Sequence, residues 1–210
     1  TLGTFLRSFT HGHVQQLDAV NTRLLAGLTS RVPGLIKGGG DPGGIAFLDV
    51  DDTIREVHGY AKQAAAYGYS KVFGLNAMLA VVSTPLTAPV IVASSLRRGN
   101  TASGSGSARM LTRAAATARQ AGVAARLMGR ADSAFYRHDL ITAMIKAKMW
   151  FSVTARKNAA VKTAISRIPE QAWVPIQYPN AVWEADDSTP EGGYWVSDAE
   201  VAETSFVAFS

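Results

Sequence analysis

Hydrophobic residues recur at helical spacing near the start of the chain. Between about Val14 and Leu28 the apolar side chains return every three or four positions, at Leu17, Val20, Leu24 and Leu28, which predicts an amphipathic helix. The pair Pro33-Gly34 signals its end. Residues 37–44 then read KGGGDPGG. This composition predicts a flexible link and not a phosphate-binding loop, because a strand follows it and the Gly-Lys-Ser/Thr ending is absent.

Three apolar runs follow the link and predict three strands in succession. They cover residues 45–53, 72–82 and 90–96, and the absence of a helical pattern between them favours an antiparallel meander. Residues 63–69 are rich in Ala and Tyr and are interpreted as a turn region.

The second half of the chain alternates helices with strands. Helical spacing covers residues 108–121 and 138–148, residues 124–131 and 150–154 predict strands, and Val161, Ile165 and Ile168 mark a last helix. The Gly- and Ser-rich segment 101–107 supplies an N-cap for the first of these helices. This order is compatible with an α/β fold, a mixed five-stranded sheet flanked by helices in which the first and fourth strands lie side by side.

The net charge of +5 hides three very different regions. Residues 1–96 have a net charge of +1, residues 97–167 carry 14 basic and 2 acidic side chains, and residues 168–210 carry 8 acidic and no basic ones. The central excess of +12 indicates a polyanionic partner, unless the acidic tail compensates it or the basic groups are solvated on helix surfaces. Nucleic acid is the leading partner class, because phosphate contacts supply most non-specific affinity.

Cysteine content and hydropathy narrow the class further. The chain has no Cys, which excludes a disulfide framework and thiolate metal sites. No apolar run approaches the roughly 20 residues of a membrane span, and the start lacks the basic-then-apolar order of a signal peptide. We therefore expect a cytoplasmic protein without a membrane partner.

Three carboxylates lie within four positions at the end of the first predicted strand. Asp49 and Asp51 project to one face and Asp52 to the other, because side chains alternate along a strand. Two carboxylates on one face repel each other unless a divalent cation, a shared proton or basic neighbours compensate. The run therefore indicates either an acidic turn capped by Asp52 and Thr53 or a metal site.

A further Asp follows the fourth predicted strand. If the first and fourth strands are neighbours, their ends bring Asp51 and Asp132 together across 81 positions of sequence. Two carboxylates that converge from neighbouring strands suit a Mg²⁺-dependent phosphoryl-transfer site. An isolated Asp at a strand end is otherwise a turn residue.

Five short segments carry a likeness to a known family. They read LDVDDT (48–53), VHGYAKQ (57–63), YGYSK (67–71), LRRGN (96–100) and RADSAFY (130–136). In this order they resemble the catalytic domain of bacterial insertion-sequence transposases of the DDE type. The segments FTHGHVQQLD (9–18) and AEVAE (199–203) are similar to that family as well, so the likeness covers nearly the whole chain.

The resemblance implies a ribonuclease H-like core with Mg²⁺ or Mn²⁺, which cleaves DNA at transposon ends and transfers the strand to a target. It places the first catalytic carboxylate at Asp51 and the second at Asp132, and Asp49 is a further candidate metal ligand. The implied partners are transposon-end and target DNA. A homodimer in a synaptic complex and a nucleoid-associated location in a bacterial cytoplasm are compatible with it.

One part of the family pattern has no counterpart. The family's third carboxylate is a Glu on a late helix after a β-rich insertion, whereas Glu200 and Glu203 lie in a stretch that alternates like a strand. We expect an N-terminal helix and linker at 1–44, a catalytic core at 45–168 and the beginning of the β-rich insertion at 169–210. Such a fragment would be inactive alone because the third acidic ligand is missing.

Basic residues near the presumed active edge are the predicted DNA contacts: Lys71, Arg97, Arg98, Arg130 and Arg137. Arg113, Arg119 and Lys162 are expected on solvated helix faces.

Two other functions fit the same residues. The run DVDDT (49–53) matches the Asp-x-Asp-x-Thr signature of haloacid dehalogenase-like phosphatases. In that chemistry Asp49 is the nucleophile, Asp51 the general acid and base, and Asp186 with Asp187 completes a Mg²⁺ site. The remaining alternative is a non-catalytic DNA-binding fragment, which differs from the transposase only in whether metal binds.

Overall fold

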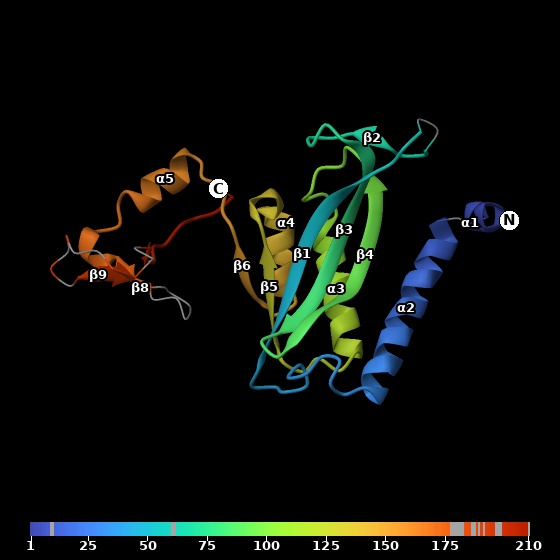
Figure 1. Cartoon of the computed structure of the whole chain (residues 1–210), viewed down its shortest axis with the longest axis horizontal. Helices are drawn as coiled ribbons and strands as arrows, with labels where there is room; N and C mark the ends of the chain where they lie inside the picture. Colours follow the sequence, from blue (N-terminus) through green and yellow to red (C-terminus); the bar gives the residue numbers. More distant parts are fainter. Residues whose placement is uncertain are drawn as a thin grey trace. The chain divides into compact units, whose positions relative to one another are not determined.

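The computed structural model of the chain describes residues 1–8, 11–59, 62–176, 183–185, 188, 190, 192–195 and 199–209. Residue contacts divide the chain into two compact units, Thr1–Ala155 and Arg156–Ser210, and Figure 1 shows the elements of each. The first unit contains the segment with the clustered carboxylates.

The first unit is built on a mixed sheet of six strands, counted over the described residues. The strand order is β2-β3-β1-β5-β6, and β4 also pairs with β3, outside this linear order. The strands are β1 (Ile45–Glu56), β2 (Ala66–Tyr67), β3 (Phe73–Thr84), β4 (Thr87–Arg98), β5 (Arg126–Ala131) and β6 (Trp150–Val153). The helices are α1 (Leu2–Arg7), α2 (His11–Arg31), α3 (Ser107–Gln120), η1 (Ser133–Phe135) and α4 (His138–Lys146).

Strand directions confirm the predicted topology. β1 pairs antiparallel with β3 and β3 with β4, whereas β1 and β5, and β5 and β6, run parallel. The predicted meander and the predicted neighbourhood of the first and fourth strands are therefore confirmed. The two-residue strand β2 extends the five-stranded sheet in the region interpreted as a turn. This order and these directions are the ones expected from the resemblance to a ribonuclease H-like core.

Strand β1 is longer than the sequence pattern indicated. It runs through all three carboxylates to Glu56, and its ladder with β3 continues until Glu56 lies opposite Gly74. Burial alternates along it, so that Ala46, Leu48 and Val50 are buried while their neighbours are not. The carboxylates therefore lie within a strand, not in a turn, and the interpretation of Asp52 and Thr53 as turn caps is wrong.

The buried face of the sheet is covered by α3 and α4, which Figure 1 shows running along one side of the strands. Small residues of α3, including the fully buried Ala114 and Ala118, let this helix approach β1, β3 and β4 closely. On β5, a Cβ atom at Gly129 would lie 2.8 Å from the Met144 Cε atom of α4. The glycine that weakens this strand by composition therefore makes room for a core methionine.

Helix α2 forms where helical spacing predicted it, but it packs by another face. Its buried side chain is Leu25, at 8% exposure, while Leu17, Val20, Leu24 and Leu28 are all exposed. Polar contacts tie α2 to α3: Arg113 donates to Asp18 at 2.8 Å, and the Thr22 and Thr117 hydroxyls are 3.2 Å apart. The apolar stripe therefore covers no part of the core in this unit.

The start of α3 differs from the prediction of a side-chain cap. Gly106, at φ +75°, occupies the N-cap position, and no side chain caps the helix. The Ser107 hydroxyl instead donates to the Gly104 carbonyl at 2.8 Å, inside the preceding loop. Segment 101–106 is thus folded on itself, and glycine is required at 106 by its positive φ.

The second unit contains short elements. They are α5 (Ala159–Ile165), η2 (Glu170–Ala172), β7 (Val174–Pro175), β8 (Trp183–Ala185), β9 (Gly193–Trp195) and β10 (Glu200–Val201). β7 pairs with β10 and β8 with β9, both antiparallel. Asp186 and Asp187 lie outside the described residues. No helix in the described part of the chain has the length and hydropathy of a membrane span.

Candidate metal and nucleic-acid site

The three carboxylates of β1 are divided between the two faces of the sheet. Asp49 and Asp51 lie opposite Val81 and Leu79 of β3, on the face away from α3 and α4, and Asp52 lies on the helix-covered face. We call the face that carries Asp49 and Asp51, away from α3 and α4, the open face. The predicted alternation of Asp49 and Asp51 against Asp52 is confirmed by this register.

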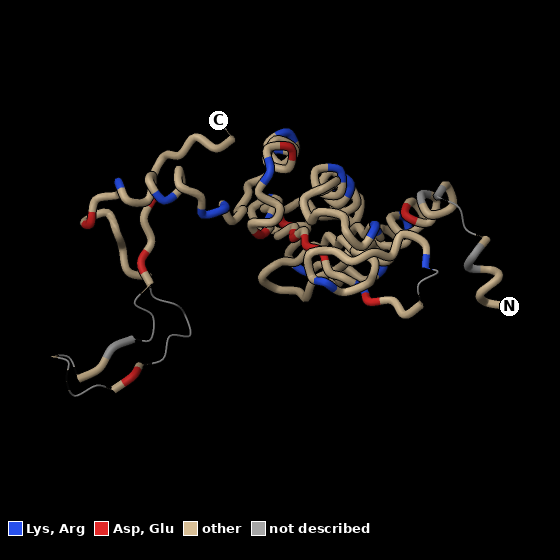
Figure 2. Tube along the Cα trace, turned by 90° about the horizontal axis from the view of Figure 1, so that it is seen from above, with Lys and Arg blue, Asp and Glu red and all other residues tan. Residues whose placement is uncertain are grey.

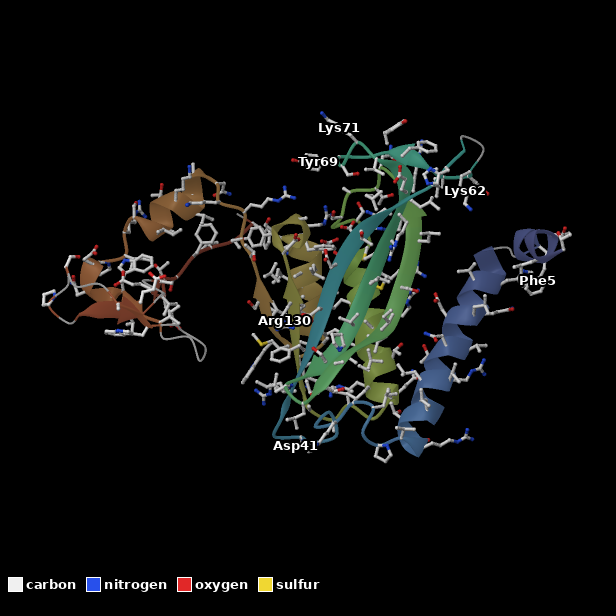
Figure 3. All side chains as sticks on the ribbon, in the orientation of Figure 1. Phe5, Asp41, Lys62, Tyr69, Lys71 and Arg130 are labelled. Atoms are coloured by element: carbon white, nitrogen blue, oxygen red, sulfur yellow. The ribbon has the colours of Figure 1, made fainter. Side chains whose placement is uncertain are left out.

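Asp49 is neutralised by an arginine on the neighbouring strand. Arg130 of β5 lies directly opposite it in the parallel ladder, and its Nε and Nη2 groups donate to Asp49 Oδ1 and Oδ2 at 2.6 and 2.7 Å. The guanidinium also stacks over the Phe47 ring, 4.1 Å from its centroid, and Figure 3 labels Arg130 beside β1. The hydrogen bond to Asp49 raises the pKa of Arg130.

Asp52 is neutralised from the helix-covered face. Its Oδ2 atom accepts hydrogen bonds from Arg97 Nη2 and Asn76 Nδ2, both at 2.6 Å. The side chains of Asp52 and Arg97 are each 11% exposed. Burial lowers the pKa of the Arg97 guanidinium, and the charge and hydrogen bond of Asp52 oppose that effect. A carboxylate so engaged has little capacity left for a metal.

Asp51 is the remaining carboxylate of the run and lacks such compensation. Its Oδ1 atom accepts the backbone N–H of Asp52 at 2.7 Å, and no basic side chain of the described residues forms an ion pair with it. The residue is exposed. Of three neighbouring carboxylates, only Asp51 therefore presents an uncompensated charge at the open face.

Asp132 is the second such carboxylate, directly after β5. Asp49 lies opposite Arg130 in the parallel register of β1 and β5. Asp51 comes two residues after Asp49, and Asp132 comes two residues after Arg130. Asp132 keeps an extended backbone, caps η1, and accepts the Ala134 N–H at 2.9 Å. It is exposed, and within the described ranges no Lys or Arg pairs with it.

This donor set fits a hard divalent cation. Mg²⁺ and Mn²⁺ bind carboxylate oxygen and retain water, so that one or two protein carboxylates suffice. Asp51 and Asp132 are carboxylates on neighbouring segments with no basic competitor, whereas Asp49 is held by Arg130. The described residues contain no group of three or more His, Cys, Asp or Glu side chains placed to hold a metal. Asp51 and Asp132 are accordingly the residues that could hold it.

The predicted DNA contacts Arg97 and Arg98 point to opposite faces of β4. Arg97 lies inside the Asp52 network, where its low exposure leaves little surface for phosphate. Arg98 is exposed and lies opposite Leu75, which in turn lies opposite Arg55 of β1. Arg55 and Arg98 therefore share the open face with Asp51, about 13 Å away along the strands at about 3.3 Å per residue.

The other predicted contacts occupy different surroundings. Lys71 is exposed in the turn before β3 with φ +58°, and Figure 3 shows it with Tyr69 projecting from that turn. Arg137 donates to Asp139 at 3.0 Å, with both side chains about half exposed. Arg55 was missed by the sequence analysis, because only the strand register reveals that it shares a face with Asp51.

Several arginines of the basic central segment make contacts within the chain. Figure 2 shows blue Lys and Arg positions along the coils of α3 and α4. Arg113 bonds Asp18 and the Ser94 carbonyl, Arg119 donates to the Val123 and Ala125 carbonyls, and Arg126 stacks on Trp150. Arg113 is partly buried and paired, so the expectation of a solvated face is wrong for it, whereas Arg119 and Lys162 are exposed as expected. The hydrogen bonds of Arg113 and Arg119 show that part of the +12 excess is already engaged within the chain.

The geometry disfavours the phosphatase interpretation. A nucleophilic Asp needs an oxygen free to attack, whereas both oxygens of Asp49 accept hydrogen bonds from Arg130. In that chemistry Ser83 or Thr84, after the predicted strand 72–82, would hold the phosphate, but Thr84 is buried and donates its hydroxyl to the Lys37 carbonyl at 2.6 Å. The pair Asp186–Asp187 lies outside the described residues.

Comparison with known proteins bears on this geometry. A family model described as "Transposase DDE domain group 1" matches residues 42–209. No curated protein matches the sequence significantly. Among solved structures, a Mos1 transposase paired-end complex with the left transposon end aligns with 13% identity and a TM-score of 0.33, covering 64% of this chain and 40% of that one. The Mos1 strand transfer complex aligns with 11% identity, a TM-score of 0.33 and coverage of 71% and 46%. The chain thus spans less than half of these proteins.

Proposed function

Because the chain belongs to the group 1 family of DDE transposase domains, we propose that Asp51 and Asp132 hold the divalent cation, Mg²⁺ or Mn²⁺, of a DNA-cleaving and strand-transferring site. The partners proposed are transposon-end DNA and a target DNA. A cation bound there supplies a Lewis acid that activates an attacking oxygen and stabilises the leaving oxygen of a phosphodiester.

One observation carries the proposal. Of the four Asp residues on β1 and directly after β5, the two that pair with arginine are Asp49 and Asp52. The other two, Asp51 and Asp132, each lie two residues beyond the last pair of the parallel ladder, Asp49 and Arg130, and both are exposed. Leaving adjacent carboxylates uncompensated costs electrostatic free energy, which a bound cation offsets. Two exposed carboxylates that lack a basic partner, beside two that have one, are the arrangement that a cation-binding site requires.

Residues of the open face provide the complementary contacts to DNA. Arg98 and Arg55 lie across the sheet from each other on that face, and Lys71 projects from the nearby turn. Arg55 lies four residues from Asp51 along β1, about 13 Å at about 3.3 Å per residue, so these positive side chains would bind phosphates away from the reacting bond. These contacts position a strand without reading its bases.

The site described by these residues is short of one ligand. Asp51 and Asp132 supply two carboxylates, and the described residues bring no third acidic side chain to them. We therefore propose that this chain alone binds metal and DNA but cleaves DNA slowly or not at all. A cleavage assay on transposon-end DNA addresses that part: robust Mn²⁺-dependent cleavage that Asp51→Ala abolishes would contradict the proposed inactivity.

The binding part is tested by the influence of Mn²⁺ on DNA affinity. Fluorescence anisotropy with a labelled duplex, at fixed ionic strength, is expected to show tighter binding to the chain when Mn²⁺ is present. The double variant Asp51→Asn/Asp132→Asn is expected to lose this dependence on Mn²⁺. The same enhancement in both proteins would place the cation elsewhere and would contradict the proposal. A chain that binds DNA without any effect of Mn²⁺ would favour the non-catalytic alternative.

A further inference from the structure

The Arg97 guanidinium connects Asp52 to the loop at residues 101–106. It has five N–H groups and makes five hydrogen bonds: two to Asn76 Oδ1, from Nε at 2.9 Å and Nη2 at 2.6 Å, and one to Asp52 Oδ2 at 2.6 Å. The remaining two go from Nη1 to the carbonyls of Ser103 and Ser105, at 3.1 and 2.6 Å. A planar fork with all of its donors used fixes the loop relative to β1 far more strictly than a single ion pair does.

The other side of the same loop touches the segment that carries Asp132. Gly104 is buried, and a Cβ atom there would lie 3.1 Å from the Ala134 carbonyl oxygen and 2.3 Å from Arg137 Cδ. The backbone of the loop therefore packs directly against η1. The Ala134 N–H is also the group that donates to Asp132 Oδ1, at 2.9 Å.

Asp51 is joined to this network by its own neighbour. The Asp52 N–H donates to Asp51 Oδ1 at 2.7 Å, so the peptide that orients the Asp51 carboxylate belongs to the residue whose side chain Arg97 holds. Contacts thus run from Asp51 through Asp52 and Arg97 to the carbonyls on either side of Gly104, and from Gly104 to Ala134 and Asp132. These residues come from four separate elements of the first unit.

We propose that Arg97, Asp52 and Gly104 form a brace that sets the position of the Asp51 carboxylate relative to that of Asp132. They are positioning residues, because each acts on the cation through another residue. The inference rests on the proposed function in one respect, that Asp51 and Asp132 are the metal ligands. It assigns Arg97 a role different from the DNA contact predicted from the sequence.

Charge and position make opposite predictions for metal affinity in Arg97 variants. If Arg97 and Asp52 acted on the cation only as charges, removing the positive Arg97 in Arg97→Gln would strengthen Mn²⁺ binding and Asp52→Asn would weaken it. A brace fails when either partner is removed. We expect both variants to lower Mn²⁺ affinity by about tenfold, the usual effect of removing a residue that orients a ligand. Isothermal titration with Mn²⁺ measures this.

Two variants separate the brace from charge altogether. Arg97→Lys keeps the charge but has no fork with which to hold two carbonyls and a carboxylate, so it is expected to bind Mn²⁺ as weakly as Arg97→Gln. Gly104→Ala adds no charge, and its methyl group displaces the Arg137 Cδ atom and presses on the Ala134 carbonyl; it is expected to weaken Mn²⁺ binding several-fold. Gly34→Ala is the matched control, since a Cβ there meets no atom within 4 Å.

A second ion pair controls for general loss of stability. Arg113 pairs with Asp18 and a backbone carbonyl away from the carboxylates, and these side chains are about one-third exposed. Arg113→Gln is expected to lower the melting temperature without changing Mn²⁺ affinity. All titrations are made at a temperature at which circular dichroism shows each variant to be folded. Stronger binding in Arg97→Gln, or unchanged binding in Arg97→Lys and Gly104→Ala, would overturn the brace.

A measurement without metal keeps the brace distinguishable from the proposed function. Amide hydrogen exchange at Asp52 and Ala134 in the metal-free protein is expected to be faster in Arg97→Lys than in the wild type, and unchanged in Arg113→Gln. Unchanged exchange at both amides in Arg97→Lys would overturn the brace whatever the metal does. Faster exchange together with no Asp51-dependent Mn²⁺ binding in the wild type would support the brace and reject the proposed metal site.

Discussion

Asp49 and Arg130 lie opposite each other on the parallel strands β1 and β5 and are joined by two hydrogen bonds of 2.6 and 2.7 Å. This pair removes Asp49 from the group of free carboxylates and leaves Asp51 two residues further along the same face. The site is thus defined by which carboxylates already have a basic partner.

Asp49→Asn tests this assignment of the carboxylates. The pair is partly exposed, with Arg130 at 43% and Asp49 at 29%, so losing the charge is expected to lower the free energy of unfolding by only about 0.5 to 1 kcal/mol. Mn²⁺ affinity is expected to change less than about twofold, because Asn still accepts a hydrogen bond from Arg130. Chemical denaturation and Mn²⁺ titration measure the two quantities. A large loss of Mn²⁺ binding would instead make Asp49 a metal ligand.

Arg98→Ala tests the open face as the DNA-binding surface. Removing one phosphate contact is expected to weaken binding of a DNA duplex several-fold and to reduce the slope of log affinity against log salt by about one. Arg23→Ala on α2, which removes the same charge from an exposed helix position, is the control and should leave the slope unchanged. Anisotropy titrations at several salt concentrations give both slopes. Equal slopes for Arg98→Ala and the wild type would show that this arginine contacts no phosphate.

Gly99→Ala tests the packing of the sheet end next to the open face. A Cβ atom at Gly99 would lie 2.0 Å from the Gly74 carbonyl oxygen and 2.5 Å from that of Ala66. Backbone atoms of paired strands have little room to move, so the variant is expected to lose more than about 2 kcal/mol of unfolding free energy. Gly27→Ala in α2, with open space around it, is expected to gain about 0.5 to 1 kcal/mol. Urea denaturation of both proteins is the measurement, and similar stabilities would contradict this packing.

The Arg137–Asp139 pair predicts a weak dependence of stability on pH. The hydrogen bond from Arg137 lowers the pKa of the Asp139 carboxyl in the folded state, against an opposing effect of burial. A carboxyl with a lowered folded pKa stabilises the fold above its unfolded pKa of about 3.9, and this contribution is lost as the pH falls through the folded pKa.

Asp139→Asn is the variant for this pair. It is expected to melt at a slightly lower temperature than the wild type near neutral pH, and the difference should vanish in acid as the pH falls through the lowered folded pKa of Asp139. Since both side chains are about half exposed, the contribution is expected to stay below about 1 kcal/mol. Melting curves across that range measure it. A difference that grew toward low pH would have the wrong sign for this pair.

The sequence predicted most of the fold because its strong signals are local. Alternation along residues 45–53 predicts β1 and the faces of Asp49 and Asp51, and the helices α3 and α4 begin within a residue of their predicted starts. The strand β5 was predicted despite its composition. Gly129 and Arg130 look unsuited to a strand until Met144 and Phe47, which pack against them, are known.

Features that depend on pairing between distant segments could not be predicted in this way. The sequence shows Arg97 and Arg98 as a basic pair, but only the strand register separates one into the Asp52 network and the other onto the open face. Helical spacing in α2 correctly predicts a helix, yet the stripe at Leu17 and Leu24 is exposed and Leu25 is buried. Periodicity identifies an apolar face without identifying what covers it.

The most direct test of the central claim is an isothermal titration of the chain with Mn²⁺ in parallel with Asp51→Asn, Asp132→Asn and their combination. We predict one class of Mn²⁺ site in the wild type and a loss of more than about tenfold in affinity in each single variant. In the double variant, the affinity is expected to fall to that of a chain without the site. Unchanged Mn²⁺ affinity in the double variant would contradict the assignment of these two carboxylates as the metal ligands.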